Sequence, residues 1–175
     1  MRCTKIFIPW FILIAACVSI LTGCRFSGHN PSSKIIPVQR LLLIPEQGSL
    51  HVRWEAKHLA IEFKGLVSQN RLTTEGHIDI TADDIQHFTL LDRLAVDIYF
   101  TDSTGRVLEK QTFYSMGPPP LAITTPLAFK HSFELPKKTS HMAFGYDGAV
   151  REDKPKTPQK KEHAVVLEFQ HSPFR

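Results

Sequence analysis

The nine histidines of the 175-residue chain make metal binding the first chemistry to test. Imidazole and carboxylate side chains gather within one stretch of eleven residues, at His77, Asp79, Asp83, Asp84 and His87. No HExxH or His-x-His spacing is present, and one strand cannot bring five side chains to a single ion. We therefore expect no metal site and interpret these residues as solvated polar groups near the end of a strand.

Thiol chemistry is limited by the positions of the three cysteines, Cys3, Cys17 and Cys24. The first two fall in a segment that begins with the positive residues Arg2 and Lys5 and continues as the uncharged run IFIPWFILIAACVSIL. This order is typical of a cleavable secretory signal. The run is shorter than the roughly 18–20 apolar residues of a membrane-spanning helix, and a proline interrupts it. The alternative is an uncleaved membrane anchor with an incidental cysteine.

The run ends in Leu21, Thr22, Gly23 and Cys24, and this L-T-G-C sequence resembles the lipobox of bacterial lipoproteins. The resemblance implies that diacylglycerol is joined to the Cys24 thiol, that the bond before it is cut and that the new amino group is acylated. Two or three acyl chains hold a protein stably on a membrane, whereas one chain is marginal. By the same resemblance, Arg25 in place of an aspartate favours the outer membrane, if the organism has one.

Cleavage of 23 of the 175 residues leaves a mature chain of 152, the size of one domain with its own core. The formal charge falls from +4 to +2 because Arg2 and Lys5 are lost, so the charge does not call for a nucleic-acid partner. The remaining cysteine carries lipid, which excludes thiol catalysis and a disulfide. Neither a G-x-S-x-G nor an S-x-x-K motif is present. We expect no cofactor apart from the covalent diacylglycerol and acyl chain on Cys24.

The elements that must position any site are predicted by a hydrophobic pattern of period two. Leu94, Val96, Ile98 and Phe100 alternate with less apolar neighbours, and similar runs occupy 59–63, 127–133, 142–146 and 165–169. Such alternation places one face of a strand on a core and the other in water. The predicted strands are 39–44, 50–55, 58–68, 72–80, 92–101, 106–114, 127–135, 141–150 and 164–170.

Turn residues separate these runs. Asp102–Gly105 is expected to close a hairpin, with Gly105 in the left-handed region, and three prolines make 117–120 a loop. Only 81–87 offers a short helix. Eight or nine strands with almost no helix predict an all-β fold, an antiparallel immunoglobulin-like β-sandwich. The predicted organisation is 1–23 signal peptide, 24–37 lipidated cysteine and flexible tether, and 38–175 sandwich domain.

Residues 61–108 read I-x-F-x-G-x-V and then L-x-V-x-I-Y-F-x-D-x-x-G-R-V-L. This order resembles the small immunoglobulin- or fibronectin-like domains of the FxLYD and LEA-14 type. The resemblance covers most of residues 50–170, and its motifs are hairpin signatures, so it supports the fold and implies no chemistry. The stretch 70–91 is longer than the family's usual loop, which leaves the strand pairing there open.

A basic segment, REDKPKTPQKK at 151–161, carries five basic and two acidic residues. We interpret it as a solvated loop between the last two strands. The alternative is a contact of Lys154, Lys156, Lys160 and Lys161 with anionic headgroups, lipopolysaccharide or cell-wall polymer. Trp54 and the pair Phe113-Tyr114 are interpreted as core and cross-strand packing in preference to a ligand platform.

These patterns predict a non-catalytic lipoprotein of the cell envelope. Membrane lipid holds it through Cys24, and the sandwich binds or scaffolds an unknown envelope protein or polymer. A carrier or chaperone for an apolar ligand is the alternative, and an envelope hydrolase is a weaker one. An exposed apolar patch would favour the binding or scaffolding module. A deep apolar cavity would favour the carrier or chaperone. A cleft of titratable groups with perturbed pKa would favour the hydrolase.

The lipobox resemblance predicts the effect of Cys24→Ala. The variant lacks the thiol that accepts diacylglycerol, so we expect it to accumulate as unlipidated precursor or soluble protein. Intact-mass analysis of membrane and soluble fractions measures both the lipid and the cleavage. A wild-type membrane product that still carries residues 1–23 would contradict the prediction.

Overall fold

The computed structural model describes residues 34–81, 88–123, 126–152 and 165–174. These ranges contain one 3-10 turn, η3 (Val38–Arg40), and no α-helix. No helix within them is long and apolar enough to cross a membrane. The strands are β1 (Leu42–Leu43), β2 (Gly48–Glu55), β3 (Leu59–Ser68), β4 (Arg71–Ile80), β5 (Leu90–Thr101), β6 (Val107–Met116), β7 (Leu121–Ala122), β8 (Leu127–Glu134), β9 (His141–Arg151) and β10 (Val166–His171).

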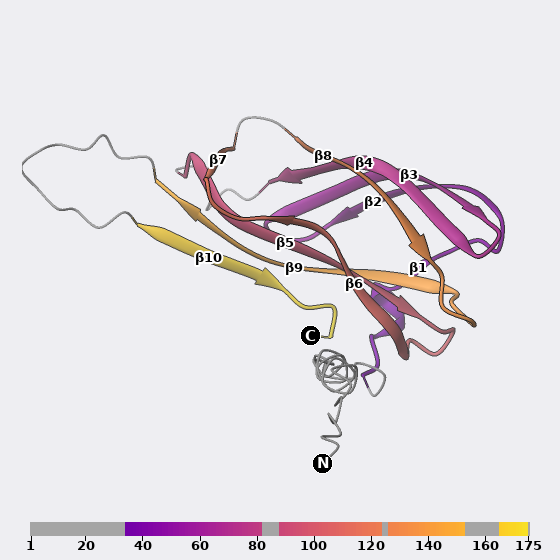
Figure 1. The fold of residues 1–175 in the computed structure, drawn as a ribbon. Coiled ribbons are helices and arrows are strands. Elements are labelled where there is room, and N and C mark those ends of the chain that lie inside the picture. The colour runs from indigo at the N-terminus through magenta and orange to yellow at the C-terminus, as the bar shows by residue number, and fades with distance from the viewer. Residues whose placement is uncertain (1–33, 82–87, 124–125, 153–164, 175) are drawn as a thin grey trace, which may run out of the picture. The chain divides into compact units, whose positions relative to one another are not determined.

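Two antiparallel sheets pack together as a β-sandwich (Figure 1). One sheet has the order β2-β3-β4-β8. In the other, β9 and β5 are central, β1 and β10 share the free side of β9, and β6 and β7 share the free side of β5. The orders β3-β4-β8 and β10-β9-β5-β6 correspond to strands A-B-E and G-F-C-C′ of an immunoglobulin-like sandwich. The predicted fold class is therefore confirmed.

Eight of the nine predicted strands coincide with observed ones, and β4 pairs with β3 along its whole length, which settles the pairing of residues 71–80. The predicted strand 39–44 is wrong over most of its length. Only Leu42 and Leu43 pair with β9, because the chain before them turns through η3 to cross the outer face of a sheet. Most of the candidate helix 81–87 lies outside the described residues.

The predicted hairpin between β5 and β6 is confirmed. The Gly105 N–H donates to the Asp102 carbonyl at 3.1 Å, and Gly105 has a φ of +82°, which favours glycine. Asp102 Oδ1 accepts hydrogen bonds from the Thr104 hydroxyl at 2.6 Å and from the backbone N–H of Arg106 at 3.1 Å. These bonds, led by the one from the Thr104 side chain, lower the pKa of Asp102.

The alternating pattern puts the expected residues into the core. Leu94, Val96, Ile98 and Phe100 are each 1% exposed or less. The ring of Phe144 on β9 lies at the centre of an aromatic cluster drawn from both sheets. Its centroid is 5.4 Å from that of Trp54, 6.0 Å from Phe63 and 6.0 Å from Phe113. The first two rings belong to the four-stranded sheet and the third to the other, so Phe144 joins the two layers.

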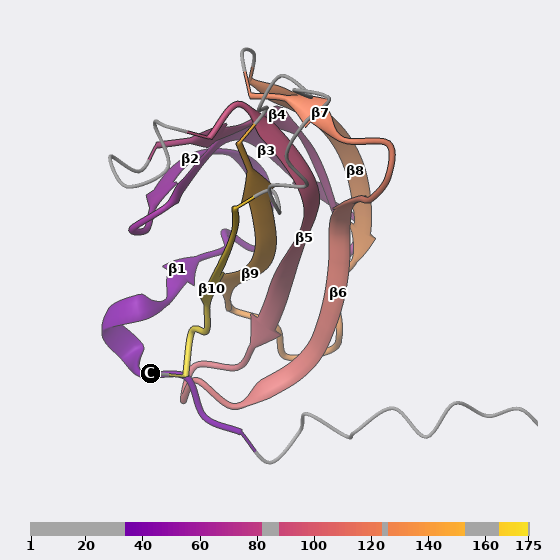
Figure 2. The same cartoon turned by 90° about the vertical axis from the view of Figure 1, so that its left-hand side faces the viewer.

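The outer face of the six-stranded sheet is not entirely in water, which departs from simple alternation. Ile36, Tyr99, Val107 and Ala143 form a second buried cluster there, with Leu41 and Phe174 against it. Ile36 and Leu41 of the entering chain pack on this face, and Figure 2 shows the segment around η3 beside β1 and β10.

The assigned tether, 24–37, therefore ends earlier than the sequence indicates. Ile36 is fully buried, Ile35 pairs with Arg106, and the Val107 N–H donates to the Lys34 carbonyl at 3.0 Å. Residues 34–37 thus pack as part of the sandwich.

Because Phe144 bridges the two layers, its truncation tests the packing directly. We expect Phe144→Ala to lower the free energy of unfolding by about 3–5 kcal/mol, since it empties a large buried ring site. Chemical denaturation of wild type and variant measures the change, with the exposed Leu66→Ala as control. A loss below about 1 kcal/mol would place Phe144 outside the core.

Candidate functional site: a cleft at the open edge of the sandwich

The two sheets each end in a free edge on one side of the sandwich, β2 in one sheet and β1 with β10 in the other. A cleft of about 330 Å³ opens there. Its lining comes from four separate parts of the chain. They are residues 39–42 of η3 and β1, residues 54–57 at the end of β2, Phe144 of β9, and His171 with Pro173 at the end of β10.

Trp54 forms the aromatic wall of the cleft. It is half-buried, because part of its surface packs on Phe144 and Tyr146, with ring centroids 5.4 and 6.2 Å away. The His171 ring meets it edge-on at 5.4 Å. Trp54 thus serves as core packing, as predicted, and also lines the cleft, a role that the sequence interpretation gave less weight.

His171 is held in place by its neighbours. Its ring stacks on that of Tyr146 with centroids 5.7 Å apart and an interplanar angle of 24°. Burial lowers the pKa of His171, and the nearby charge of Arg40 lowers it further. The imidazole is therefore neutral at pH 7, with one nitrogen able to donate a hydrogen bond and the other able to accept one.

Arg40 supplies the positive charge. Its Nη1 donates to the Ser172 carbonyl at 3.3 Å, which ties η3 to the end of the chain. Among the described residues, no carboxylate lies within 4.0 Å of this guanidinium. A partly buried arginine without a carboxylate partner, beside an aromatic wall and a neutral imidazole, is suited to binding an anionic group on an apolar body.

A second polar group lies on the outer face of the six-stranded sheet. Lys110 Nζ is 2.8 Å from Asp97 Oδ2, and the Thr112 hydroxyl donates to the other carboxylate oxygen at 2.6 Å. Burial opposes the charge of Lys110, but the bond and charge of Asp97 outweigh it and raise its pKa. Lys110 stays protonated at neutral pH, so its amine is not available as a general base.

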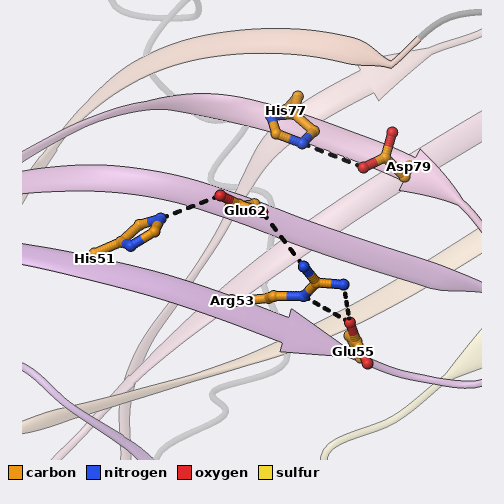
Figure 3. A network of polar contacts seen from close by, with 6 residues as sticks. All are labelled: His51, Arg53, Glu55, Glu62, His77 and Asp79. Atoms are coloured by element: carbon orange, nitrogen blue, oxygen red, sulfur yellow. Dashed lines mark hydrogen bonds and ion pairs between the residues drawn. The ribbon is translucent and has the colours of Figure 1, made fainter.

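The outer face of the four-stranded sheet carries a network of polar contacts (Figure 3). Arg53 lies 2.7 Å from Glu55 and 3.9 Å from Glu62, and His51 lies 3.2 Å from Glu62. The hydrogen bond and charge of Glu55 raise the pKa of Arg53. All four side chains are at least 36% exposed, and exposed ion pairs of this kind contribute little to stability. We interpret this face as solvated surface.

Other residues singled out by the sequence are not brought into one site. His77 and Asp79 form an exposed pair on β4, 3.2 Å apart, whereas Asp83, Asp84 and His87 lie outside the described residues. Within the described ranges, no three potential metal ligands converge. The lipobox residues Leu21, Thr22, Gly23 and Cys24, and the lysines Lys154, Lys156, Lys160 and Lys161, also lie outside those ranges.

Phe113 and Tyr114 both pack against the core, as predicted. A β-bulge explains how two consecutive residues do so. Tyr114 pairs with Val96 and Thr112 with Asp97, which leaves Phe113 as the extra residue. The ring of Phe113 lies 5.0 Å from that of Phe129.

The sequence interpretation missed the cleft because Arg40, Trp54 and His171 have no fixed spacing along the chain. The pairing of β1 and β10 with the same side of β9 brings Arg40 and His171 together, and the packing of the two sheets places Trp54 beside them. Comparisons of the chain with protein-family models, curated proteins and solved structures found no match. The chemistry of the cleft is therefore argued from its own residues.

The lowered pKa of His171 has a measurable consequence. NMR titration of the imidazole, assigned by its loss in His171→Gln, should give a midpoint below the usual 6.5. The neutral ring favours the fold, so its stabilisation is complete above pH 6.5 and declines as the pH falls toward the folded-state pKa. His171→Gln should flatten the pH dependence of stability in that window. A midpoint at or above 6.5 would contradict the assigned environment.

Proposed function

We propose that this protein is a non-catalytic lipoprotein of the bacterial envelope, anchored to a membrane by lipid on Cys24. The sandwich binds or scaffolds another envelope component, and the cleft at its open edge is the proposed binding site. Arg25 favours attachment to the outer membrane where the organism has one. The proposal is carried by the composition of the surface at which the predicted anchor segment enters the sandwich.

This surface, here called the tether pole, is one end of the sandwich. Ile35 pairs with Arg106 after the β5–β6 hairpin, and the Ser140 N–H donates to the Thr101 carbonyl at 3.0 Å, so the turns before β6 and β9 are neighbours. The pole consists of exposed residues from the entering chain and these turns, namely Lys34, Ile35, Leu43, Arg106, Lys137 and Lys138.

The composition of the tether pole suits a lipid surface. Ile35 is 63% exposed and Leu43 69% exposed, whereas most large apolar residues within the described ranges are buried. The pole carries four cations, Lys34, Arg106, Lys137 and Lys138, and the acid Asp102 lies beside Arg106 in the hairpin turn. Cations near an anionic bilayer contribute about 1 kcal/mol each, and exposed apolar side chains enter its interface. Both features therefore support an anchored orientation with this pole toward the membrane.

The described residues on either side of positions 153–164, which include most of the basic segment, lie at the opposite pole. The Glu152 N–H, near the start of the segment, lies 3.4 Å from the carbonyl of Val165, which follows the segment. Strand β9 runs from His141 at the tether pole to Arg151, a length of about 33 Å at 3.3 Å per residue. The contact of Lys154, Lys156, Lys160 and Lys161 with an anionic polymer stays a prediction, because these lysines lie outside the described residues.

The core favours surface binding over transport of an apolar ligand between the sheets. A void lined by Phe63, Phe113, Phe129, Phe133 and Phe144 is too small to admit water. An apolar ligand would have to displace these rings. The hydrolase alternative gains no support from Lys110, because its pairing with Asp97 raises its pKa and keeps the amine protonated at neutral pH.

The proposed orientation predicts where lipid contacts the domain. The mature chain has no cysteine besides Cys24, so Ile35→Cys provides a unique site for an environment-sensitive fluorophore. In vesicles containing anionic lipid, we expect the label on the mature lipoprotein to shift to the blue and to be quenched by lipid-bound quenchers. The matched control is Leu121→Cys, an exposed apolar position on β7 at the opposite pole.

The control label should remain in water, with little shift or quenching. Equal spectra and equal quenching at the two positions would contradict the orientation. Mass analysis of the same samples reports whether Cys24 is lipidated, so a failure of anchoring is distinguished from a wrong orientation.

A further inference from the structure

We propose that the cleft at the open edge binds a sugar ring that carries an acidic group, with the ring against Trp54 and the acid at Arg40. The inference rests on the proposed function in one respect, that an envelope protein meets carboxylated and phosphorylated glycans. The class of ligand itself is argued from the residues of the cleft.

The wall of the cleft matches one face of a sugar ring. A pyranose presents C–H groups on its faces and hydroxyls around its rim, and an indole offers a flat apolar surface to the C–H groups. Trp54 cannot turn freely, because Phe144, Tyr146 and His171 contact it from within the protein. A rigid aromatic surface binds at low cost in conformational entropy.

The rim of the cleft matches hydroxyl groups. The neutral His171 has one donor and one acceptor nitrogen, and the exposed Gln39 adds an amide with both capacities. A purely apolar ligand would leave these groups without partners after removing their water, which is unfavourable. The cleft therefore favours a ligand with polar groups at its edge.

Arg40 gives the preference for an acid. Elsewhere on the domain, Arg53, Arg71 and Arg93 are each paired with a carboxylate. Among the described contacts of Arg40, only Nη1 is engaged, by the carbonyl of Ser172. Its remaining N–H donors suit a carboxylate or a phosphate, which accept paired hydrogen bonds from a guanidinium.

The size and openness of the cleft limit the ligand. A volume of about 330 Å³ lies at the lower end of the range for small-molecule sites, so it fits one ring with its substituent. The cleft opens at the surface between two sheet edges, so the ring can remain part of a longer glycan.

The experiment uses the purified mature lipoprotein in detergent micelles. Trp54 is its one tryptophan, since Trp10 leaves with the signal, so its fluorescence reports on the cleft. The probes are N-acetylmuramic acid for a carboxylate and N-acetylglucosamine 6-phosphate for a phosphate, with neutral N-acetylglucosamine and acetate as references. We expect at least one acidic sugar to bind about tenfold or more tightly than either reference, because hydrogen bonds to charged groups are the stronger ones.

Arg40→Gln should remove that preference, whereas Arg71→Gln, a change at an exposed arginine of β4 that pairs with Glu134, should keep it. Near-ultraviolet circular dichroism of each variant checks that the aromatic packing is retained. Arg40→Lys keeps the positive charge without the guanidinium, so it should keep part of the affinity that Arg40→Gln loses. A neutral sugar or acetate that binds as tightly, a short acidic peptide that binds more tightly, or no change with any acidic sugar would overturn the proposal. Intact-mass analysis of the same sample shows whether Trp10 has been removed and Cys24 carries lipid, so a failure of processing is distinguished from a failure of the cleft to bind.

Discussion

Contact between aromatic rings across the two sheets is the interaction on which this sandwich depends. In antibody domains a disulfide joins the two strands that correspond to β4 and β9 here, and this chain has no cysteine in either strand. Phe144 on β9 instead touches rings from β2, β3 and β6. Edge-to-face contacts of this type add to the free energy of burial and fix the relative position of the layers. The position of Trp54, and hence of the cleft, follows from that packing.

The two ends of the domain close a second, smaller cluster on the outside. Ile36 from the entering chain and Phe174 near the C-terminus both pack against Tyr99, whose ring is 5.4 Å from that of Phe174. Lys34 lies 5.1 Å from the centre of the Phe174 ring, a favourable cation–π distance. The cluster brings both ends to the tether pole. The proposed anchor at residue 24 would therefore pull on a well-packed segment.

Period-two alternation was enough to predict the strands, because each strand places a full set of apolar residues on one face. The β5–β6 hairpin was predicted from its turn residues, because Asp102 and Gly105 have distinct local roles there. Alternation failed for Ile36 and Leu41, because a segment that crosses a sheet buries single residues without any period. The alternation also predicts burial where there is none. Val165 belongs to the apolar run of the last strand, but its side chain is 52% exposed. The cleft joins positions 40, 54 and 171, which strand pairing and the packing of the two sheets bring together.

The open edge explains why a site of this kind lies where it does. An edge strand exposes backbone groups that pair readily with other chains, and charged side chains oppose that pairing. On β2 the side chains of His51, Arg53 and Glu55 are exposed and charged or ionisable, which protects the edge along most of its length. Trp54 points to the other face of the strand, toward the core, so it is screened from large partners but remains reachable through the gap between the sheets. The arrangement that discourages strand pairing thus leaves an aromatic surface accessible to a small polar ligand.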